Sequence, residues 1–193
     1  MKYPEIYILR HGQTEWNAER RLQGRLDSPL TKTGRAQARM QRAILGNLDL
    51  NGFQAFSSPQ ARAFHTASLA LEGLFPAIHT DPRLCEIDVG RWQGKLVSEL
   101  SLADLPSDDE QASLELSGSA PGGEGFAALR ERCTAFLMQL SAPAVIVTHG
   151  ITSRMLRLVI LGLQTDEIGT LDGGQGTVFH LHDGAQSKLA IRA

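Results

Sequence analysis

Two histidine–glycine pairs each come directly after a short apolar run in this sequence of 193 residues. The first pair, His11-Gly12, is preceded by Arg10, and the second is His149-Gly150. A neutral histidine nitrogen is a competent nucleophile, and an arginine guanidinium donates forked hydrogen bonds to phosphate or carboxylate oxygens. The pairs therefore indicate covalent chemistry on an anionic group. For the first pair taken alone, an Arg and a His that merely pair with carboxylates remain the alternative.

An arginine and two acidic residues extend this set. Arg62 falls in the first turn of a predicted helix, where free backbone N–H groups and the helix dipole favour an anion. A cation is unfavourable there, so Arg62 indicates that an anion compensates it, although most first-turn arginines are simply solvated. Glu86 and Asp88 each offer a carboxylic acid that could protonate a leaving alkoxide. Spacing alone leaves both carboxyl groups open.

Metal binding by His11 and His149 is a rival interpretation. The His-x-x-x-His spacing and the nearby carboxylates that would favour a metal site are absent beside either histidine. His180 and His182 share one face of a predicted strand, and we interpret them as part of an exposed edge. The sequence therefore predicts neither a metal nor another cofactor.

The composition excludes several classes of protein. Nineteen Lys plus Arg against 21 Asp plus Glu give a net charge of -2, without the broad basic surface of a nucleic-acid-binding protein. No apolar run approaches the roughly 20 residues that cross a bilayer, and the first run ends at Arg10, where a secretory signal would continue. Two widely spaced cysteines, Cys85 and Cys133, suit a reduced compartment. We therefore expect a cytoplasmic protein that binds neither nucleic acid nor membranes.

Predicted strands and helices alternate along a chain expected to form one domain over residues 1–193. The strands are Glu5–Leu9, Phe53–Ser57, Ala144–Thr148 and a closing hairpin of Thr177–Leu181 with Lys188–Ile191. The helices run from a Thr33 cap to about Leu48 (Ala36, Met40, Ala43 and Ile44 on one face), onward from Ser58-Pro59 (Ala63, Ala67 and Ala70 packed), and to Leu161.

This alternation predicts an α/β sandwich with a mainly parallel sheet and helices on both faces. In such sheets ligands bind beyond the carboxyl ends of the strands, where His11 and His149 fall. Residues 84–125, rich in Ser, Asp, Gly and Pro, are predicted to cross the mouth of this site, with a short helix near Leu96–Leu100. Trp16, Trp92 and Arg25 are candidates for flanking the mouth.

In their order along the chain, these motifs resemble the histidine phosphatase superfamily, in its phosphoglycerate mutase-like branch. The motifs are Arg10-His11-Gly12, Asn17, Gln23-Gly24, Asp27-Ser-Pro-Leu30-Thr, Ser57-Ser-Pro59 with Arg62 and Thr66, Leu84-x-Glu86, Gly90-x-Trp92-x-Gly94, Pro121-Gly-Gly-Glu124 and Thr148-His149-Gly150. The resemblance covers nearly the whole chain. It implies a three-layer αβα sandwich and a two-step reaction without metal.

The resemblance also implies a role for each site residue. His11 would attack phosphorus and become phosphohistidine, while Arg10, Arg62 and His149 hold the phosphoryl oxygens. Glu86 would protonate the leaving oxygen and then activate water, with an acidic to neutral pH optimum. The phosphate pocket would be completed by Asn17, Gln23, Gly24 and Gly150.

Three functions stay open at this point. A phosphatase acting on a small phosphorylated metabolite is favoured, as in bacterial broad-specificity or α-ribazole phosphatases. A phosphoglycerate mutase is the alternative, but the mutases resemble longer chains with extra basic residues, whereas Ser107–Glu110 is short and acidic. A non-catalytic phosphate-binding module is the third. Apolar residues within Leu96–Leu116 leave a homodimer contact open.

Overall fold

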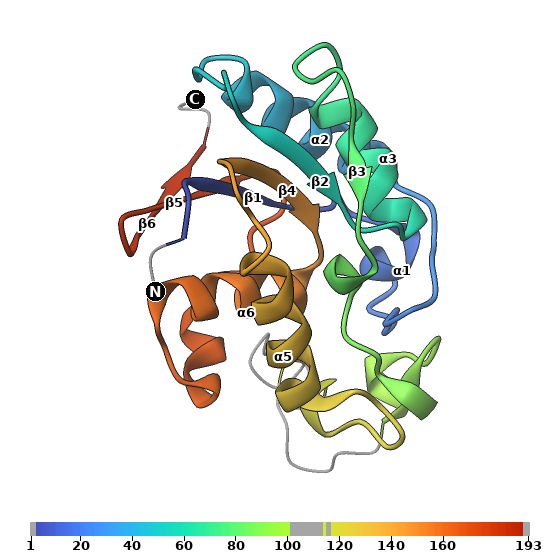
Figure 1. The fold of residues 1–193 in the computed structure, drawn as a ribbon. Coiled ribbons are helices and arrows are strands. Elements are labelled where there is room, and N and C mark those ends of the chain that lie inside the picture. Colours follow the sequence, from blue (N-terminus) through green and yellow to red (C-terminus); the bar gives the residue numbers. More distant parts are fainter. Residues whose placement is uncertain (1–2, 101–113, 115–116, 191–193) are drawn as a thin grey trace.

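The structure, a computed structural model, describes residues 3–100, 114 and 117–190 (Figure 1). Its strands are β1 (Ile6–Arg10), β2 (Gln54–Ser57), β3 (His79–Thr80), β4 (Ala144–Thr148), β5 (Val178–His182) and β6 (Ala185–Leu189). Its α-helices are α1 (Glu15–Ala18), α2 (Lys32–Leu45), α3 (Ala61–Ala70), α5 (Gly125–Leu137) and α6 (Gly150–Leu161). Short 3-10 helices cover Pro82–Leu84, Gly90–Trp92, Val97–Glu99 and Thr165–Thr170.

The strands form one sheet in the order β3-β2-β4-β1-β5-β6. The first four run parallel, whereas β5 pairs antiparallel with β1, and β6 antiparallel with β5. At the carboxyl ends of the two central strands, Arg10 of β1 is paired with Thr148 of β4. The predicted mostly parallel sheet is confirmed, and the segments that follow β1 and β4 lie side by side.

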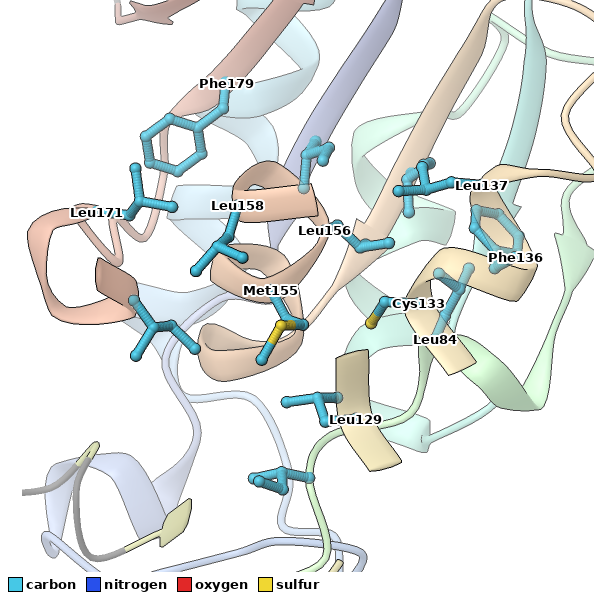
Figure 2. Packing of buried hydrophobic residues seen from close by; sticks show 14 of the residues in the cluster. Leu84, Leu129, Cys133, Phe136, Leu137, Met155, Leu156, Leu158, Leu171 and Phe179 are labelled. Carbon is cyan, nitrogen blue, oxygen red and sulfur yellow. The ribbon is translucent and has the colours of Figure 1, made fainter. Parts of the chain in front are cut away.

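Alternate residues of the central strands face two hydrophobic clusters. Ile6 and Ile8 pack in the cluster that contains α5 and α6, whereas Tyr7 and Leu9 pack in the cluster that contains α2 and α3. Helices therefore cover both faces of the sheet, which confirms the three-layer αβα sandwich (Figure 1). Figure 2 shows the first cluster, where Cys133 is packed among leucines and burial raises the pKa of its thiol to about 12.

The start and the buried face of α2 differ from the prediction. Thr31, not Thr33, caps the helix, because its Oγ1 accepts the backbone N–H of Gly34 at 3.0 Å. Ala36, Met40 and Ala43 are exposed, so three of the four residues chosen for the apolar face are wrong. The buried positions are Gly34, Ala38, Gln41, Ile44 and Leu45.

Backbone packing explains why the helix turns this face inward. A Cβ on Gly34 would lie 2.0 Å from the Gln13 carbonyl oxygen, so only glycine allows this approach. Gln41 is fully buried and donates from Nε2 to the carbonyl oxygens of Arg10 at 2.9 Å and Thr177 at 3.1 Å. Gly34 and Gln41 therefore occupy buried positions of the helix, where hydrophobicity alone predicts no buried residue.

Other boundaries follow the sequence more closely. β4 and the end of α6 are as predicted, Ala63, Ala67 and Ala70 are buried, and the hairpin turns at Asp183-Gly184. The second hairpin strand begins earlier than predicted, at Ala185, and Ile191 lies outside the described residues. α3 begins after Gln60, two residues later than predicted. The sequence did not predict β3 or α5.

The predicted crossing segment is described only in part. Its short helix near Leu96–Leu100 is present as the 3-10 helix Val97–Glu99, whereas residues 101–113 and 115–116 lie outside the described residues. The acidic stretch Ser107–Glu110 lies there as well. Across the described part of the chain, no helix is long and apolar enough to span a membrane.

Candidate active site

Three neighbouring parallel strands deliver the central side chains to one edge of the sheet. His11 follows β1, Ser58 follows β2 and His149 follows β4. Backbone bonds extend the pairing past the strand ends: His11 N–H donates to Thr148 O and Ser58 N–H to Val147 O, both at 2.9 Å. The rings of His11 and His149 consequently lie edge to face with centroids 5.2 Å apart.

The His11 ring is buried, and two hydrogen bonds define its tautomer. Nδ1 lies 2.7 Å from the Gly12 carbonyl oxygen, which can only accept, so Nδ1 carries the proton. Nε2 accepts from Nε of Arg62 at 3.3 Å and therefore presents a lone pair. Burial, followed by the charges of Arg62 and Arg10, holds the His11 pKa well below its usual range. His11 is therefore a neutral imidazole beside cations, with the lone pair of Nε2 directed at Arg62.

Arg62 is 1% exposed and its guanidinium is held by the loop that follows Gln23. Nη2 donates to the Gly24 carbonyl oxygen at 2.8 Å, and Nη1 donates to Leu26 O at 2.6 Å and Asp27 Oδ1 at 2.7 Å. Burial lowers the pKa of Arg62 from its ordinary value, although the nearby carboxylates of Glu86 and Asp27 oppose this. These bonds fix the direction in which Nε points, which is toward His11.

Asp27 supplies the anion that the first-turn arginine indicated. Its carboxylate accepts the backbone N–H groups of Ala61 at 3.0 Å and Arg62 at 3.3 Å, in addition to the Arg62 guanidinium. Asp27 therefore caps α3 and neutralises its cation together. Because the compensating anion belongs to the chain itself, the position of Arg62 in the helix is no evidence for a ligand.

His149 is fully buried and bonded on one side only. Its Nε2 lies 2.8 Å from Ser58 Oγ, and Ser58 Oγ accepts the Gln60 backbone N–H at 3.2 Å, so the hydroxyl proton can be donated to Nε2 while Nδ1 carries the ring proton. Its Nδ1 is buried and has no hydrogen-bond partner among the described residues. Burial, then the charges of Arg62 and His11, lowers the His149 pKa well below its usual range. A buried polar atom without a partner is costly unless a ligand completes it.

Arg10 and Gly150 meet at the start of α6. A Cβ on Gly150 would lie 3.1 Å from Cζ and 3.2 Å from Nε of Arg10. The glycine therefore lets the guanidinium lie against the first turn of the helix, where backbone N–H groups also favour an anion. The structure brings both predicted residues to the same edge as His149.

Of the two candidate acids, Glu86 lies at the start of α6. Its Oε1 accepts the backbone N–H groups of Ile87 and Thr152, each at 3.0 Å, and its Oε2 accepts that of Ile151 at 3.2 Å. Asp88 instead accepts the Gly90 N–H at 2.7 Å within its own loop. Spacing left both carboxyl groups open, and the structure places Glu86, not Asp88, at the first turn of the helix that His149 precedes.

The loop of Asp88 is fastened to the segment before α5. Glu124 N–H donates to Asp88 O and Arg91 N–H to Pro121 O, both at 3.0 Å, while Glu124 Oε2 accepts the Asp88 N–H at 3.2 Å. Arg132 binds both carboxylate oxygens of Glu124. The two ends of the predicted crossing segment therefore meet.

The remaining predicted pocket residues occupy less direct positions. Gly24 has a φ of +53° and presents its carbonyl oxygen to Arg62. Gln23 is buried, and its Oε1 accepts Ser28 Oγ at 3.3 Å. Asn17 completes the capping box of α1, with Oδ1 accepting the Thr14 N–H at 3.1 Å.

The three residues predicted to flank the mouth of the site lie in three different environments. Trp16 approaches Gly94, where a Cβ would lie 3.7 Å from the indole and 3.9 Å from Leu26. Trp92 is partly buried against the first hydrophobic cluster. Arg25 pairs with Glu124 at 3.5 Å. The Gly94 position therefore lies near both the indole of Trp16 and the exposed side chain of Leu26, which belongs to the loop around Arg62.

Residues that the sequence left without a role complete the centre. Asp27 and Ser58 lie inside motifs that drew attention, but their partners are far away in sequence. Gln175 reaches back to His11 O and Asn17 Oδ1, each at 3.4 Å. Gln60 joins Gly24 to Glu86. Hydrogen bonds between residues so far apart in the chain are not predicted by any local sequence pattern.

The described residues contain no group of three or more His, Cys, Asp and Glu side chains placed to hold a metal ion. His180 and His182 lie at the opposite edge of the sheet, since the register pairs Ile6 with Leu181. His180 Nε2 bonds Glu5 Oε1 at 2.7 Å, and its ring stacks on Tyr7.

Comparison with known proteins gives the family. The model of the histidine phosphatase superfamily, branch 1, matches residues 6–190. The chain belongs to this superfamily. The two histidines and the arginines described above are its candidate set for phosphoryl transfer.

Both mutases and phosphatases are found among the curated relatives and solved structures that are similar to this member of the superfamily. It is 31% identical to "Probable phosphoglycerate mutase GpmB" of Serratia proteamaculans, over 82% of this chain and 75% of that protein. It is 37% identical to a phosphoglycerate mutase of Thermus thermophilus, covering 97% and 99% of the chains with a TM-score of 0.71. It is 30% identical to a mycobacterial glucosyl-3-phosphoglycerate phosphatase solved with VO3, covering 97% and 98% with a TM-score of 0.77.

Proposed function

We propose that this protein is a metal-independent phosphatase that hydrolyses a small phosphomonoester, a phosphorylated metabolite of the cytoplasm, through phosphohistidine at His11. The observation that carries the proposal is the lone pair on His11 Nε2, fixed by the Nδ1–H bond to Gly12 O and pointing at the Arg62 guanidinium. Nε2 attacks phosphorus, and the bond from phosphorus to the ester oxygen breaks.

The cations and His149 would then stabilise the transferring group. When Nε2 of His11 bonds phosphorus, the Nε–H of Arg62 loses its acceptor and is placed for a phosphoryl oxygen. His149 Nδ1, now without a partner among the described residues, supplies a second contact, and Arg10 a third. Donors held in place before the reaction stabilise developing charge without reorganisation. Asn17, Gln23, Gly24 and Gly150 complete the pocket in this proposal.

Glu86 is the proposed acid and, in the second step, the base. Its Oε1 also lies 3.0 Å from Thr152 Oγ1, so the first turn of α6 orients the carboxyl group. In the first step a proton on the carboxyl goes to the leaving oxygen. In the second step the carboxylate accepts a proton from the water that breaks the phosphorus–nitrogen bond.

Mutase activity is the second candidate, favoured by relatives named phosphoglycerate mutase. A mutase must retain a phosphorylated intermediate and bind the substrate carboxylate with further cations. Arg25, the cation nearest to Gly24 in the sequence, is instead paired with Glu124. Hydrolysis is therefore the proposal, and a non-catalytic phosphate-binding module is the outcome if neither activity is found.

The test is hydrolysis of 4-nitrophenyl phosphate by wild type and His11→Ala, each with and without EDTA. We expect turnover that survives the chelator and is lost in the variant. Loss of wild-type activity on chelation would refute metal independence. If 3-phosphoglycerate with a bisphosphate primer is isomerised faster than any ester is hydrolysed, the protein is a mutase. Vanadate binding without either reaction would identify a binding module.

A further inference from the structure

A buried glutamine connects the proposed acid to the loop that holds Arg62. Gln60 is 8% exposed and is the N-cap residue of α3. Its Oε1 accepts the backbone N–H of Glu86 at 2.6 Å, and its Nε2 donates to the Gly24 carbonyl oxygen at 3.0 Å. A backbone N–H can only donate and a carbonyl oxygen can only accept, so the orientation of the amide is fixed.

Both ends of the bridge lead to reacting groups. The Gly24 carbonyl oxygen accepts Arg62 Nη2 as well as Gln60 Nε2. At the other end, Gln60 holds the main chain of Glu86, while the first turn of α6 holds its carboxyl group. Glu86 is therefore located by the starts of two helices, α3 and α6.

The Gln60 amide accepts the main-chain N–H of Glu86, the proposed acid. Without this amide, the Glu86 N–H would lose its acceptor at 2.6 Å. The Glu86 carboxyl would then be positioned through its α6 contacts alone. Because proton transfer depends on sub-ångström placement, a small shift lowers the rate without emptying the phosphate site.

We infer that Gln60 is a positioning residue that sets the location of Glu86 for protonation of the leaving group. This inference rests on the proposed phosphatase function. It predicts that the role of Gln60 is seen with esters whose leaving group needs a proton and is hardly seen with esters whose leaving group does not.

The experiment compares kcat/KM for two esters, since kcat/KM reports the steps up to transfer from substrate. Phenyl phosphate has a leaving group with a pKa near 10, whereas 4-nitrophenolate departs readily without a proton. Glu86→Gln should lose about 100-fold on phenyl phosphate, and far less on 4-nitrophenyl phosphate. Gln60→Leu, which keeps the side-chain size, should lose about tenfold on phenyl phosphate and about twofold on the other ester.

Two controls separate positioning from general damage. Gln41→Leu changes another buried glutamine, one whose amide bonds Arg10 O and Thr177 O rather than Glu86, and should lower both rates by the same factor. In the double variant with Glu86→Gln, Gln60→Leu should cost less than about twofold more on phenyl phosphate, because its effect passes through Glu86.

The outcomes are distinguishable. Equal losses on both esters for Gln60→Leu, or losses that multiply in the double variant, overturn the inference and leave the proposed function standing. If Glu86→Gln itself loses the same factor on both esters, Glu86 is not the acid and the inference fails with it. If wild type hydrolyses neither ester, the proposed function fails first.

Discussion

The carboxylate of Asp27 binds Arg62 twice, at the guanidinium Nη1 over 2.7 Å and at the backbone N–H over 3.3 Å. The arginine is buried and the aspartate is 33% exposed. A single carboxylate thus starts α3 and orients the side chain that faces His11 Nε2. Position along the helix and direction of the guanidinium are therefore set together.

Asp27→Ala should lower both activity and stability. The buried guanidinium loses its counter-charge, and α3 loses its cap, which costs about 2 kcal/mol of unfolding free energy. A misdirected Arg62 should reduce kcat/KM about tenfold to 100-fold. Glu19→Gln, which breaks the exposed pair with Arg21, is the control and should change stability by at most about 0.5 kcal/mol. Indistinguishable results for the two variants, in urea unfolding and in kinetics, would contradict this role.

The pH dependence of the rate follows from His11. Burial and the neighbouring cations lower its pKa well below the usual value, so the attacking nitrogen stays unprotonated as pH falls from 7. The acidic limb of kcat/KM should therefore lie well below pH 6.5. A rate that climbs steadily to about pH 10 would exclude Glu86 as the proton donor.

Stability should depend on pH through the same two histidines. His11 and His149 titrate below their unfolded value of about 6.5, so the unfolded chain binds more protons below that pH. Their contribution is complete above about pH 6.5 and is lost as pH falls toward the native values, at up to about 2.7 kcal/mol per pH unit. Urea titrations of wild type and of His149→Gln should show a shallower slope in the variant. The exposed His65→Asn should leave the slope unchanged.

The cap of α2 separates two threonines that are close in sequence. Thr31→Ala removes the acceptor for the Gly34 N–H and should lower the unfolding free energy by about 1 kcal/mol. Thr33→Ala lies on the exposed side of the first turn and should be nearly neutral. The reverse order in thermal or urea unfolding would restore the start of the helix predicted from the sequence.

The contact between α2 and the loop after β1 should tolerate no side chain. A Cβ on Gly12 would lie 2.2 Å from the Gly34 carbonyl oxygen, so Gly12→Ala must displace backbone and should cost about 3 kcal/mol. Gly46→Ala is the matched control, because Gly46 has a φ of -65° and its Cβ would meet only its own helix, at 3.3 Å. Equal stability of the two variants would show that the loop yields easily.

The sequence predicted what depends on local pattern. Because strands alternate with helices, the sequence predicts the three-layer fold and the apolar run of β4. Because ligands bind at one edge of such a sheet, it also draws attention to the histidines that follow β1 and β4. The buried face of α2 differs from the prediction because Gly34 and Gln41 are buried through contacts with backbone far away in the sequence, and not because they are hydrophobic. Periodicity carries no information on such contacts.

The same limit applies to the site. The sequence predicts His11 and Arg62 as candidate site residues because each is an unusual residue type for its position, and the structure brings the two side chains together. The sequence predicts no role for Gln60, because the residues it joins, Gly24 and Glu86, lie 36 and 26 positions away. It predicts none for Asp27, because its partner Arg62 lies 35 positions away. The anion inferred for Arg62 is present, but it is the carboxylate of Asp27 in the same chain and not a bound ligand.

The hydrogen bonds between Asp88 and Glu124 affect how much the length of the segment between these residues can vary. Two backbone bonds and a carboxylate join Asp88 and Arg91 to Pro121 and Glu124, so the chain between Arg91 and Pro121 has fixed ends. Lengthening a loop with fixed ends costs only about 0.6 kcal/mol per doubling. A segment of another length between the same fixed ends should therefore leave the free energy of unfolding nearly unchanged.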